Sequence, residues 1–236
     1  MKLKTAVIIA GGKGTRLEEH TEDLPKPLIP ICGKPILERM IEWLKKNGVE
    51  NIVIGVAYKK EMIKNYVGDG GDFGVKITYT EHDEKGGTED AFKAAILQSG
   101  IKDENFYAMN GDQLTDLQLE GLTNLHIIKG SIATLVTVKL RTNFGIIDAG
   151  NHGEVISFRE KGPVPGYIIN SGIYVFNKKI KKFLKGGNIE ENTFRKLIKR
   201  KKIHSFYYDG LWLTVNDKKV LKRAEEFITK FEKLMK

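Results

Sequence analysis

Short apolar runs alternate with longer amphipathic segments over the first half of the chain. Four runs predict strands that are buried on both faces of a sheet: residues 5–10, 51–57, 75–80 and 105–110. Three segments with apolar residues at helical spacing predict helices: residues 35–48, 59–68 and 88–100. This alternation predicts an α/β fold in which helices cover both faces of a wound, mostly parallel sheet.

Residues at the helix ends fit these boundaries. Pro35 suits the first turn of its helix, and Gly48 suits the position just beyond the last turn. Thr88 is the expected N-cap of the third helix, because its hydroxyl can accept a hydrogen bond from a free backbone N–H.

The pattern changes after about residue 130. Four strand signals follow one another, separated by Gly and Asn turns: residues 131–140, 144–148, 153–160 and 167–176. A helix is predicted over residues 217–236 from its apolar spacing. With no linker and no internal repeat, the sequence predicts one domain over residues 1–236, made of two halves that meet at about residue 115 and share one sheet.

Composition narrows the functional classes without selecting one. The net charge of +9 fits nucleic acid, phosphorylated substrates or a membrane surface, but no nucleic-acid motif accompanies it. No apolar run approaches about 18 residues, so no membrane span is expected. Cys32 is the one cysteine and predicts a reducing compartment, with the thiol expected to be buried. The N-terminal apolar run is too short for a signal peptide, so we expect a cytoplasmic protein.

A glycine-rich loop, GGKGTR, follows the first predicted strand at residues 11–16. Such a turn lies at the carboxyl edge of a sheet, where its bare backbone can approach phosphate groups. Arg16 would add a forked cationic donor. Lys13 between two glycines excludes the G-x-x-x-x-G-K-[ST] loop, and Leu17 breaks the G-x-G-x-x-G pattern. Taken alone, the segment could also be an ordinary tight turn.

The segment LPKPLIP, residues 24–30, holds Lys26 between two prolines. A residue before proline favours an extended backbone, so Lys26 is predicted to be extended, with its ammonium aimed at low entropic cost. The alternative is a solvated lysine in a proline turn. The glycine loop and this lysine, about ten residues apart after one strand, are together much more specific than either alone.

The whole motif, AGGKGTRLEEHTEDLPKPLIPICGKPIL, resembles the sugar-1-phosphate nucleotidylyltransferases, also called nucleotide-sugar pyrophosphorylases. The resemblance continues in family order through GGTEDA, NGD, FGIID, REKG and INSGIYVF, and covers most of the chain. It implies a Rossmann-like three-layer α/β/α fold of the nucleotide-diphospho-sugar transferase type. It also implies transfer of a nucleotidyl group from an NTP to a sugar 1-phosphate, with Mg²⁺ as cofactor.

The resemblance assigns roles residue by residue. The nucleotide-binding positions lie in the first half: Ala10, Gly11, Gly12, Gly14, Thr15, Arg16, Lys26, Gly87 and Asp112. The sugar-phosphate positions lie in the second: Gly145, Glu160, Lys161 and Asn170. Four of these are the implied catalytic residues, namely Arg16, Lys26, Asp112 and Lys161, and Asp112 is the implied metal ligand.

Plainer alternatives exist for several of these positions. Asp112 could belong to a simple NGD turn, and Glu160 with Lys161 could form a surface ion pair. His82 is predicted to be an exposed loop histidine. Thr214 stands where the family usually has a second metal-binding aspartate, with Asn216 and Asp217 nearby.

This departure keeps a non-catalytic regulatory paralogue open as an alternative, beside a cytidylyltransferase for a non-sugar phosphate. The nucleobase, the sugar and the presence of a homo-oligomer are left open. The expected partners are an NTP and a sugar 1-phosphate, with no nucleic acid and no membrane.

Overall fold

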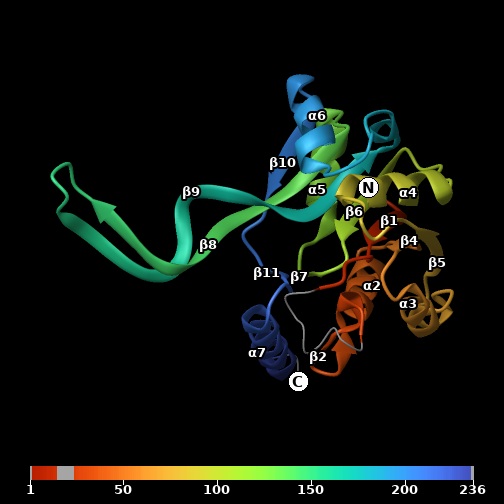
Figure 1. Cartoon of the computed structure of the whole chain (residues 1–236), viewed down its shortest axis with the longest axis horizontal. Helices are drawn as coiled ribbons and strands as arrows, with labels where there is room; N and C mark the ends of the chain where they lie inside the picture. Colours follow the sequence, from red (N-terminus) through yellow and green to blue (C-terminus); the bar gives the residue numbers. More distant parts are fainter. Residues whose placement is uncertain (1, 15–23, 235–236) are drawn as a thin grey trace.

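The computed structural model describes residues 2–14 and 24–234 of the chain. Its centre is a seven-stranded sheet with the strand order β10-β8-β9-β6-β1-β4-β5 (Figure 1). The neighbours among β6, β1, β4 and β5 are parallel, whereas β9 is antiparallel to both β6 and β8. The strands are β1 (Thr5–Ile9), β4 (Asn51–Val56), β5 (Lys76–Glu81), β6 (Asn105–Asn110), β8 (Ala133–Ala149), β9 (Val155–Asn177) and β10 (Ile203–Tyr207). The predicted, mostly parallel sheet is confirmed.

Helices cover both faces of this sheet and make three layers. One face packs against α2 (Ile36–Lys46), α3 (Lys60–Val67), α5 (Leu119–Lys129) and α7 (Lys218–Leu234). The other packs against α4 (Thr88–Gln98), η4 (Lys178–Lys182), the π-helical turn η5 (Glu190–Phe194) and α6 (Arg195–Lys199). In β1, Ala6 and Ile8 point into the first core and Val7 into the second, because successive side chains of a strand alternate between faces.

Most predicted helix boundaries hold. Gly48 follows α2 with a φ of 88°, the left-handed conformation expected just beyond a helix. The prediction that Thr88 caps α4 is wrong: Gly87 is the N-cap, and the Asp90 carboxylate accepts a hydrogen bond from its N–H at 3.1 Å. The sequence did not predict α5, whose apolar residues lie on several sides and give no clear period.

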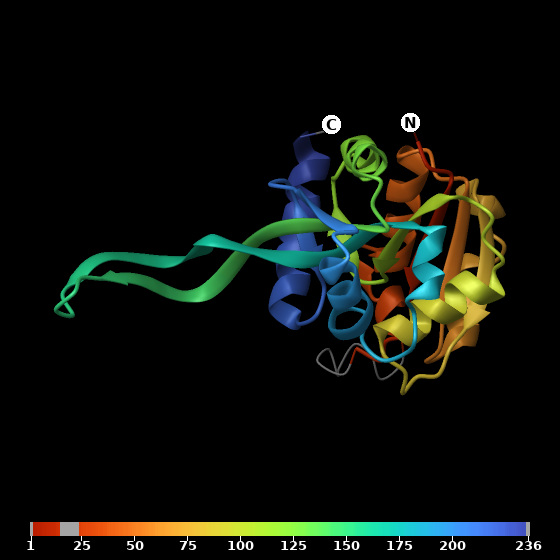
Figure 2. The same ribbon diagram turned by 90° about the horizontal axis from the view of Figure 1, so that it is seen from above.

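Four short strands were predicted after residue 130, and the structure replaces them by two long ones. β8 and β9 stay paired across register shifts, including one between Thr142 and Gly145. Lys161 has a φ of 60° and Gly162 a φ of 125°, so the chain turns locally without leaving the ladder. The outer part of this hairpin projects far from the rest of the molecule (Figures 1 and 2).

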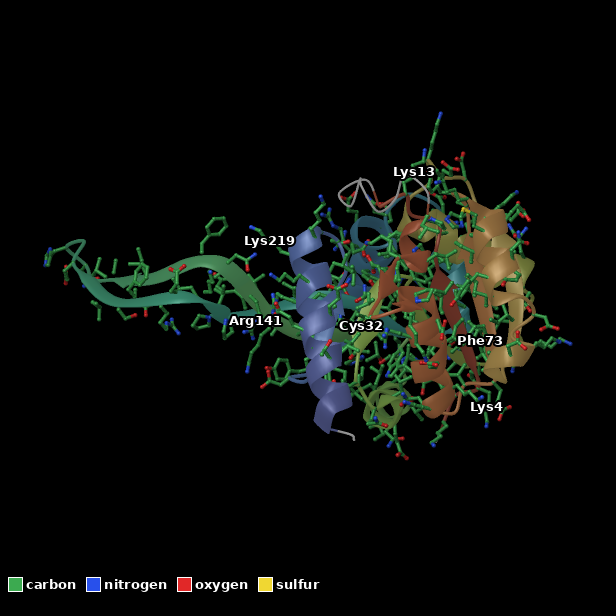
Figure 3. The ribbon with its side chains drawn as sticks, turned by 90° about the horizontal axis from the view of Figure 1, so that it is seen from below. Lys4, Lys13, Cys32, Phe73, Arg141 and Lys219 are labelled. Atoms are coloured by element: carbon green, nitrogen blue, oxygen red, sulfur yellow. The ribbon has the colours of Figure 1, made fainter. Side chains whose placement is uncertain are left out.

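Two local predictions are corrected in the segment after the glycine loop. Lys26 does not have an extended backbone; it opens a 3-10 turn, η2 (Lys26–Leu28), closed by hydrogen bonds from Leu28 N and Ile29 N. Cys32 is exposed, not buried, because it lies at the turn between β2 (Pro30–Ile31) and β3 (Lys34–Pro35) (Figure 3).

The remaining described elements are η3 (Gly71–Phe73) and the antiparallel pair β7 (Gln113–Thr115) and β11 (Trp212–Thr214). Among the helices that the structure describes, none combines the length and apolar character that crossing a membrane requires.

Candidate active site

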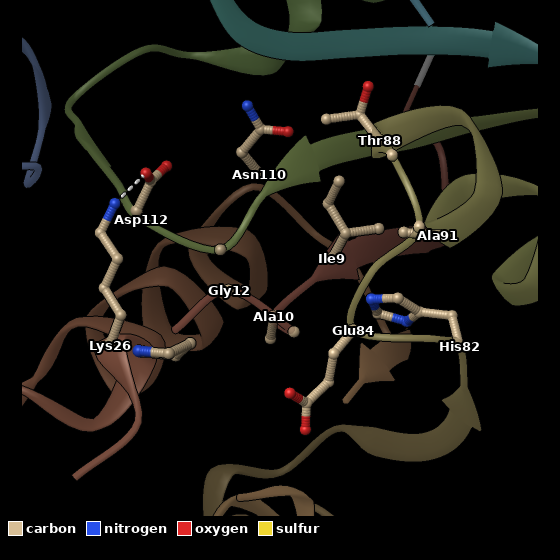
Figure 4. Close-up of a pocket in the computed structure, with 15 residues that line it drawn as sticks. Ile9, Ala10, Gly12, Lys26, His82, Glu84, Thr88, Ala91, Asn110 and Asp112 are labelled. Atoms are coloured by element: carbon tan, nitrogen blue, oxygen red, sulfur yellow. Dashed lines mark hydrogen bonds and ion pairs between the residues drawn. The ribbon is translucent and has the colours of Figure 1, made fainter. Parts of the chain in front are cut away.

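A cavity of about 230 Å³ opens at the carboxyl ends of β1 and β6. It is lined by the glycine loop, by Lys26, by the segment around His82 and Thr88, and by residues 110–112 (Figure 4). The Ala10 N–H donates to Gly55 O at 2.7 Å, and the Gly111 N–H donates to Ile9 O at 2.8 Å, so the loops are fixed to the strand ends. This is the sheet edge where open α/β folds bind ligands.

Two glycines at this cavity are required by close packing. A Cβ at Gly11 would lie 2.4 Å from His82 Nε2, and a Cβ at Gly87 would lie 2.1 Å from Gly187 O. Any larger residue would push these loops apart. Glycine is therefore needed at these two positions because neighbouring segments of the chain pack closely there.

Lys26 and Asp112 form an ion pair at one side of the cavity (Figure 4). Lys26 Nζ donates to Asp112 Oδ2 and to Asn216 Oδ1, both at 2.5 Å. The two side chains of the pair are only 12% and 18% exposed, so solvent screens the charges weakly. The ammonium is thus aimed, as predicted, although a turn and not an extended backbone aims it.

Side chains around Asp112 hold this cluster in place. Gln113 Nε2 donates to Asp112 Oδ1 at 2.6 Å, and Asn216 Nδ2 donates to Thr214 Oγ1 at 3.1 Å. Thr214 therefore orients the amide of Asn216, whose oxygen faces Lys26. Asp217 is exposed and accepts from Val220 N at 2.9 Å at the start of α7, so it does not take part in the cluster.

Two polar atoms in the cavity wall lack a hydrogen-bond partner. They are Asn110 Oδ1 and His82 Nδ1, two of three such buried side-chain atoms in the described part of the chain. A buried polar atom without a partner is costly, so a ligand that supplies donors would relieve both. His82 is half-buried on the side of the cavity away from Lys26 (Figure 4), which corrects the predicted exposed histidine, and burial lowers its pKa.

The mouth of the cavity carries a cross-loop ion pair. Lys13 Nζ of the glycine loop lies 3.0 Å from Glu84 Oε2, and it also lies 5.4 Å from the centre of the Tyr58 ring. The hydrogen bond to Glu84 raises the pKa of Lys13. Both side chains of the pair are more than one-third exposed, so the pair contributes little to stability.

Among the predicted nucleotide-binding residues, six line the cavity together: Ala10, Gly11, Gly12, Lys26, Gly87 and Asp112. Gly14 lies within the glycine loop at a φ of 69° and is not part of the lining. Thr15 and Arg16 lie outside the described residues. Sequence reasoning gave no site role to Asn110, and it noted Asn216 only as a neighbour of Thr214.

The predicted sugar-phosphate residues lie elsewhere. Gly145 and Glu160 are paired on the projecting β8–β9 hairpin, with Lys161 beside them, and none of the three lines the cavity. Asn170 lies at the base of the hairpin, where its Nδ2 donates to the Tyr174 hydroxyl at 2.8 Å and its Oδ1 accepts from Gly172 N.

The residues around Asp112 are compatible with a magnesium ion shared with substrate. Among the described residues, no three His, Cys, Asp or Glu side chains gather into a protein-only metal site. Mg²⁺ is commonly held by one or two carboxylates together with substrate phosphates and water, and Asp112 beside the cavity offers one carboxylate.

Comparisons with known proteins agree with this geometry. The family model described as Nucleotidyl transferase matches residues 5–229. The UTP–glucose-1-phosphate uridylyltransferase of Synechocystis sp. is 33% identical over 212 residues, which are 82% of this chain and 55% of the relative. The D-glycero-alpha-D-manno-heptose 1-phosphate guanylyltransferase of Campylobacter jejuni is 39% identical over 176 residues, which are 74% of this chain and 76% of the relative. The chain spans about half to three-fifths of the length of most curated relatives that it matches.

Among solved structures, HddC from Yersinia pseudotuberculosis complexed with GMP-PN has a TM-score of 0.74 and 27% identity, and the match covers 96% of this chain and 100% of that one. The family match, the relatives and the shared fold lead to one assignment. The chain belongs to the nucleotidyl transferase family and, within it, to the sugar-1-phosphate nucleotidylyltransferases.

Proposed function

We propose that the chain transfers a nucleotidyl group from an NTP to a sugar 1-phosphate and releases pyrophosphate. The observation that carries this proposal is the Lys26–Asp112 pair, fixed at 2.5 Å beside a cavity that the glycine loop lines. A nucleotide in that cavity would place its phosphates between bare loop backbone and a cation that solvent screens weakly.

The chemistry of this transfer needs no general base. The second pKa of a phosphate monoester is about 6, so the attacking oxygen of a sugar 1-phosphate is largely ionised at neutral pH. The obstacle is the approach of one anion to another and the charge that builds on the leaving pyrophosphate. Fixed cations lower such a barrier, because they need no reorganisation during the reaction. Asp112 and Asn216 hold the Lys26 ammonium in this way.

The other side of the cavity suits the nucleoside. Burial lowers the pKa of His82, so its ring is neutral at pH 7 and can contribute hydrogen bonds but no charge. His82 Nδ1 and Asn110 Oδ1 would gain partners from a base or a ribose. Arg16 is proposed to neutralise the departing pyrophosphate, and Lys161 to hold the phosphate of the sugar.

Magnesium belongs to the same proposal. Asp112 would hold Mg²⁺ together with substrate phosphates, with Asn216 and Gln113 positioning the carboxylate and its counter-ion. The bound ion would supply further positive charge to the α-phosphate during transfer.

Names of the relatives suggest which substrates to test first. Those names include uridylyl and guanylyl transfer, to glucose, mannose and heptose 1-phosphates. NTPs and sugar 1-phosphates are cytoplasmic metabolites, so we also propose that the protein is cytoplasmic.

The test is a matrix of five NTPs against these sugar 1-phosphates in Mg²⁺, measured by pyrophosphate release. We expect one or a few pairs to give turnover that Asp112→Asn abolishes. Asp209→Asn is the matched control, because that carboxylate is 60% exposed on the surface. Nucleotide binding without pyrophosphate release would instead favour a regulatory paralogue, and release only with CTP and a non-sugar phosphate would favour a cytidylyltransferase.

A further inference from the structure

The β8–β9 hairpin contains a segment, residues 142–168, that we call the arm. β8 pairs with β10 only up to Thr137, and β9 pairs with β6 only from Ile173 onwards. Between these points the two strands pair only with each other. Figures 1 and 2 show this ribbon projecting away from the three layers. An isolated two-stranded ribbon is marginally stable in water, so a projecting one calls for a surface that covers it.

The two faces of the arm differ in their side chains. On one face, Ile147 and Phe158 are direct cross-strand partners, and Gly145 with Glu160 is the next pair on the same face. The opposite face is mixed: Ser157 donates to Asp148, and Arg159 lies 3.5 Å from the same carboxylate, while Ile146 is the cross-strand partner of Arg159. The face that carries Ile147 and Phe158 is the more apolar one, and an exposed apolar sheet face normally packs against protein.

The arm concentrates exposed apolar side chains. The arm holds seven of the fifteen exposed large hydrophobic side chains in the described part of the chain. Phe144 is 80% exposed, Ile156 69% and Phe158 60%. Neighbours in a strand point to opposite faces, so Val155 and Ile156 do not share a face, nor do Tyr167 and Ile168. At roughly 100 Å² of exposed surface each, about four of the seven give ~400 Å² on one face, the size of an exposed apolar patch that marks an interaction site.

Charge favours a second copy of this chain as the occupant. The arm carries two cations and three anions, so it contributes −1 to the net charge of +9, and the rest of the chain contributes +10. An arm without excess positive charge has little electrostatic attraction to nucleic acid or to anionic membranes, whereas the body of another copy carries charge of the opposite sign. Exchange of identical arms about a two-fold axis gives a closed dimer, the commonest symmetric assembly.

The placement of the substrate residues gives the exchange a function. Glu160 lies ten residues before Asn170 along β9, on the projecting part of the hairpin, and neither Glu160 nor Lys161 lines the chain's own cavity. The cation in the described lining of the chain's own cavity is Lys26, already bonded to Asp112 and Asn216. A sugar 1-phosphate must reach the α-phosphate of the nucleotide, so Lys161 has to act at a cavity that its own arm does not reach in this structure.

We propose that the arm crosses to a second copy of this chain, where its apolar face packs, and that Glu160 and Lys161 complete the sugar 1-phosphate half of the partner copy's site. This inference rests on the proposed function for the role of the two residues, but not for the contact between copies.

The contact is tested by mass alone. Light scattering after size exclusion should give a dimer for the wild type and a monomer for Phe158→Asp. Ile198→Asp on α6 is the matched control, because Ile198 is 61% exposed and Phe158 is 60% exposed. A monomeric wild type, or a Phe158→Asp dimer, would overturn the exchange. Neither mass measurement depends on enzymatic activity.

The shared site is tested by complementation. Lys26→Ala and Lys161→Ala should each be inactive, and co-expression at equal amounts should make half of the dimers mixed. In a mixed dimer, one site combines an intact body with an intact arm, so about a quarter of all sites regain wild-type turnover.

The matched control is co-expression of Lys26→Ala with Asp112→Asn, which places both defects in the body and should restore nothing. A dimer in which Lys26→Ala and Lys161→Ala also restore nothing would overturn the shared site and show that each arm serves its own chain. A wild type without pyrophosphate release for any substrate pair would count against the proposed function, and the mass measurement would still decide the contact.

Discussion

Replacing Lys26 by methionine should lower both the turnover number and the free energy of unfolding. Methionine keeps an unbranched stem but loses the charge and the three donors of the ammonium. In the wild type, that ammonium bonds at 2.5 Å to Asp112 Oδ2 and to Asn216 Oδ1. The variant would leave the Asp112 carboxylate, only 18% exposed, with Gln113 as a neutral partner.

The size of the effect follows from this burial. Removing one partner of a fully buried ion pair costs about 3–5 kcal/mol, whereas an exposed pair is worth about 0–1 kcal/mol. The Lys26–Asp112 pair lies nearer the buried case, although solvent reaches its carboxylate, so we expect a loss of about 2 kcal/mol in the free energy of unfolding. Loss of one fixed electrostatic donor at a reacting centre lowers turnover by about 10²–10³-fold, and we expect that range here.

Two assays measure these changes separately. Urea unfolding gives the stability loss, and initial rates of pyrophosphate release at saturating substrates give the loss in turnover. Lys60→Met is the matched control, because Lys60 and Glu81 lie 2.6 Å apart but are 42% and 47% exposed. Lys26→Arg keeps the charge but changes its shape, so it should still lose at least about tenfold in turnover. A Lys26→Met chain within about threefold of the wild-type rate would refute the catalytic role of this lysine.

Three further changes test other parts of the molecule. Burial lowers the pKa of His126 to about 4 in the folded chain, whereas an unperturbed histidine has a pKa of about 6.5. As the pH falls below about 6.5, His126 is protonated in the unfolded chain but stays neutral in the folded chain, so the free energy of unfolding decreases. Urea titrations should show a loss of about 2 kcal/mol between pH 7 and pH 5, and His126→Gln should flatten that slope. Gly87→Ala should lower the thermal midpoint because its Cβ would meet Gly187 O, whereas Gly12→Ala, which has open space, should not; equal midpoints would contradict the packing. Thr214→Asp should raise turnover at low Mg²⁺ by placing a second carboxylate beside Asn216; an unchanged Mg²⁺ titration would show that residue 214 does not face the metal.

The parallel half of the fold could be predicted because its information is local. Each buried strand there is a continuous apolar run, and each helix between strands carries its own apolar stripe. The glycine loop, Lys26 and Asp112 each follow or flank such an element, so the rule that ligands bind at the carboxyl edge of the sheet brought them together. The contact between Lys26 and Asp112 joins residues 86 positions apart, and the sequence predicted the shared sheet edge but not the contact itself.

The segment around Thr214 shows what a local pattern does not report. Thr214 occupies the family position, but Asn216, 190 residues after Lys26, is the side chain that meets the ammonium. β11 pairs with β7 so that Thr214 lies opposite Gln113, and the chain reaches the Lys26–Asp112 pair only two residues later. That register depends on how two short strands, far apart in the sequence, pair with each other. It cannot be predicted from the spacing of residues within LWLTVND.

The arm shows a different limit. Alternation along residues 144–148 and 153–160 correctly indicated strands, but it did not tell whether the ladder continues past Lys161. The left-handed backbone of Lys161, followed by Gly162, allows β9 to run on to Asn177, and this continuity carries Glu160 away from Asn170. A residue assigned to a substrate by its place in the chain can therefore lie far from that substrate's cavity within one copy. An arm with many exposed apolar side chains and a net charge of −1, on a chain of net charge +9, favours the proposed second copy, because burial of that apolar surface and completion of the site would then be the same event.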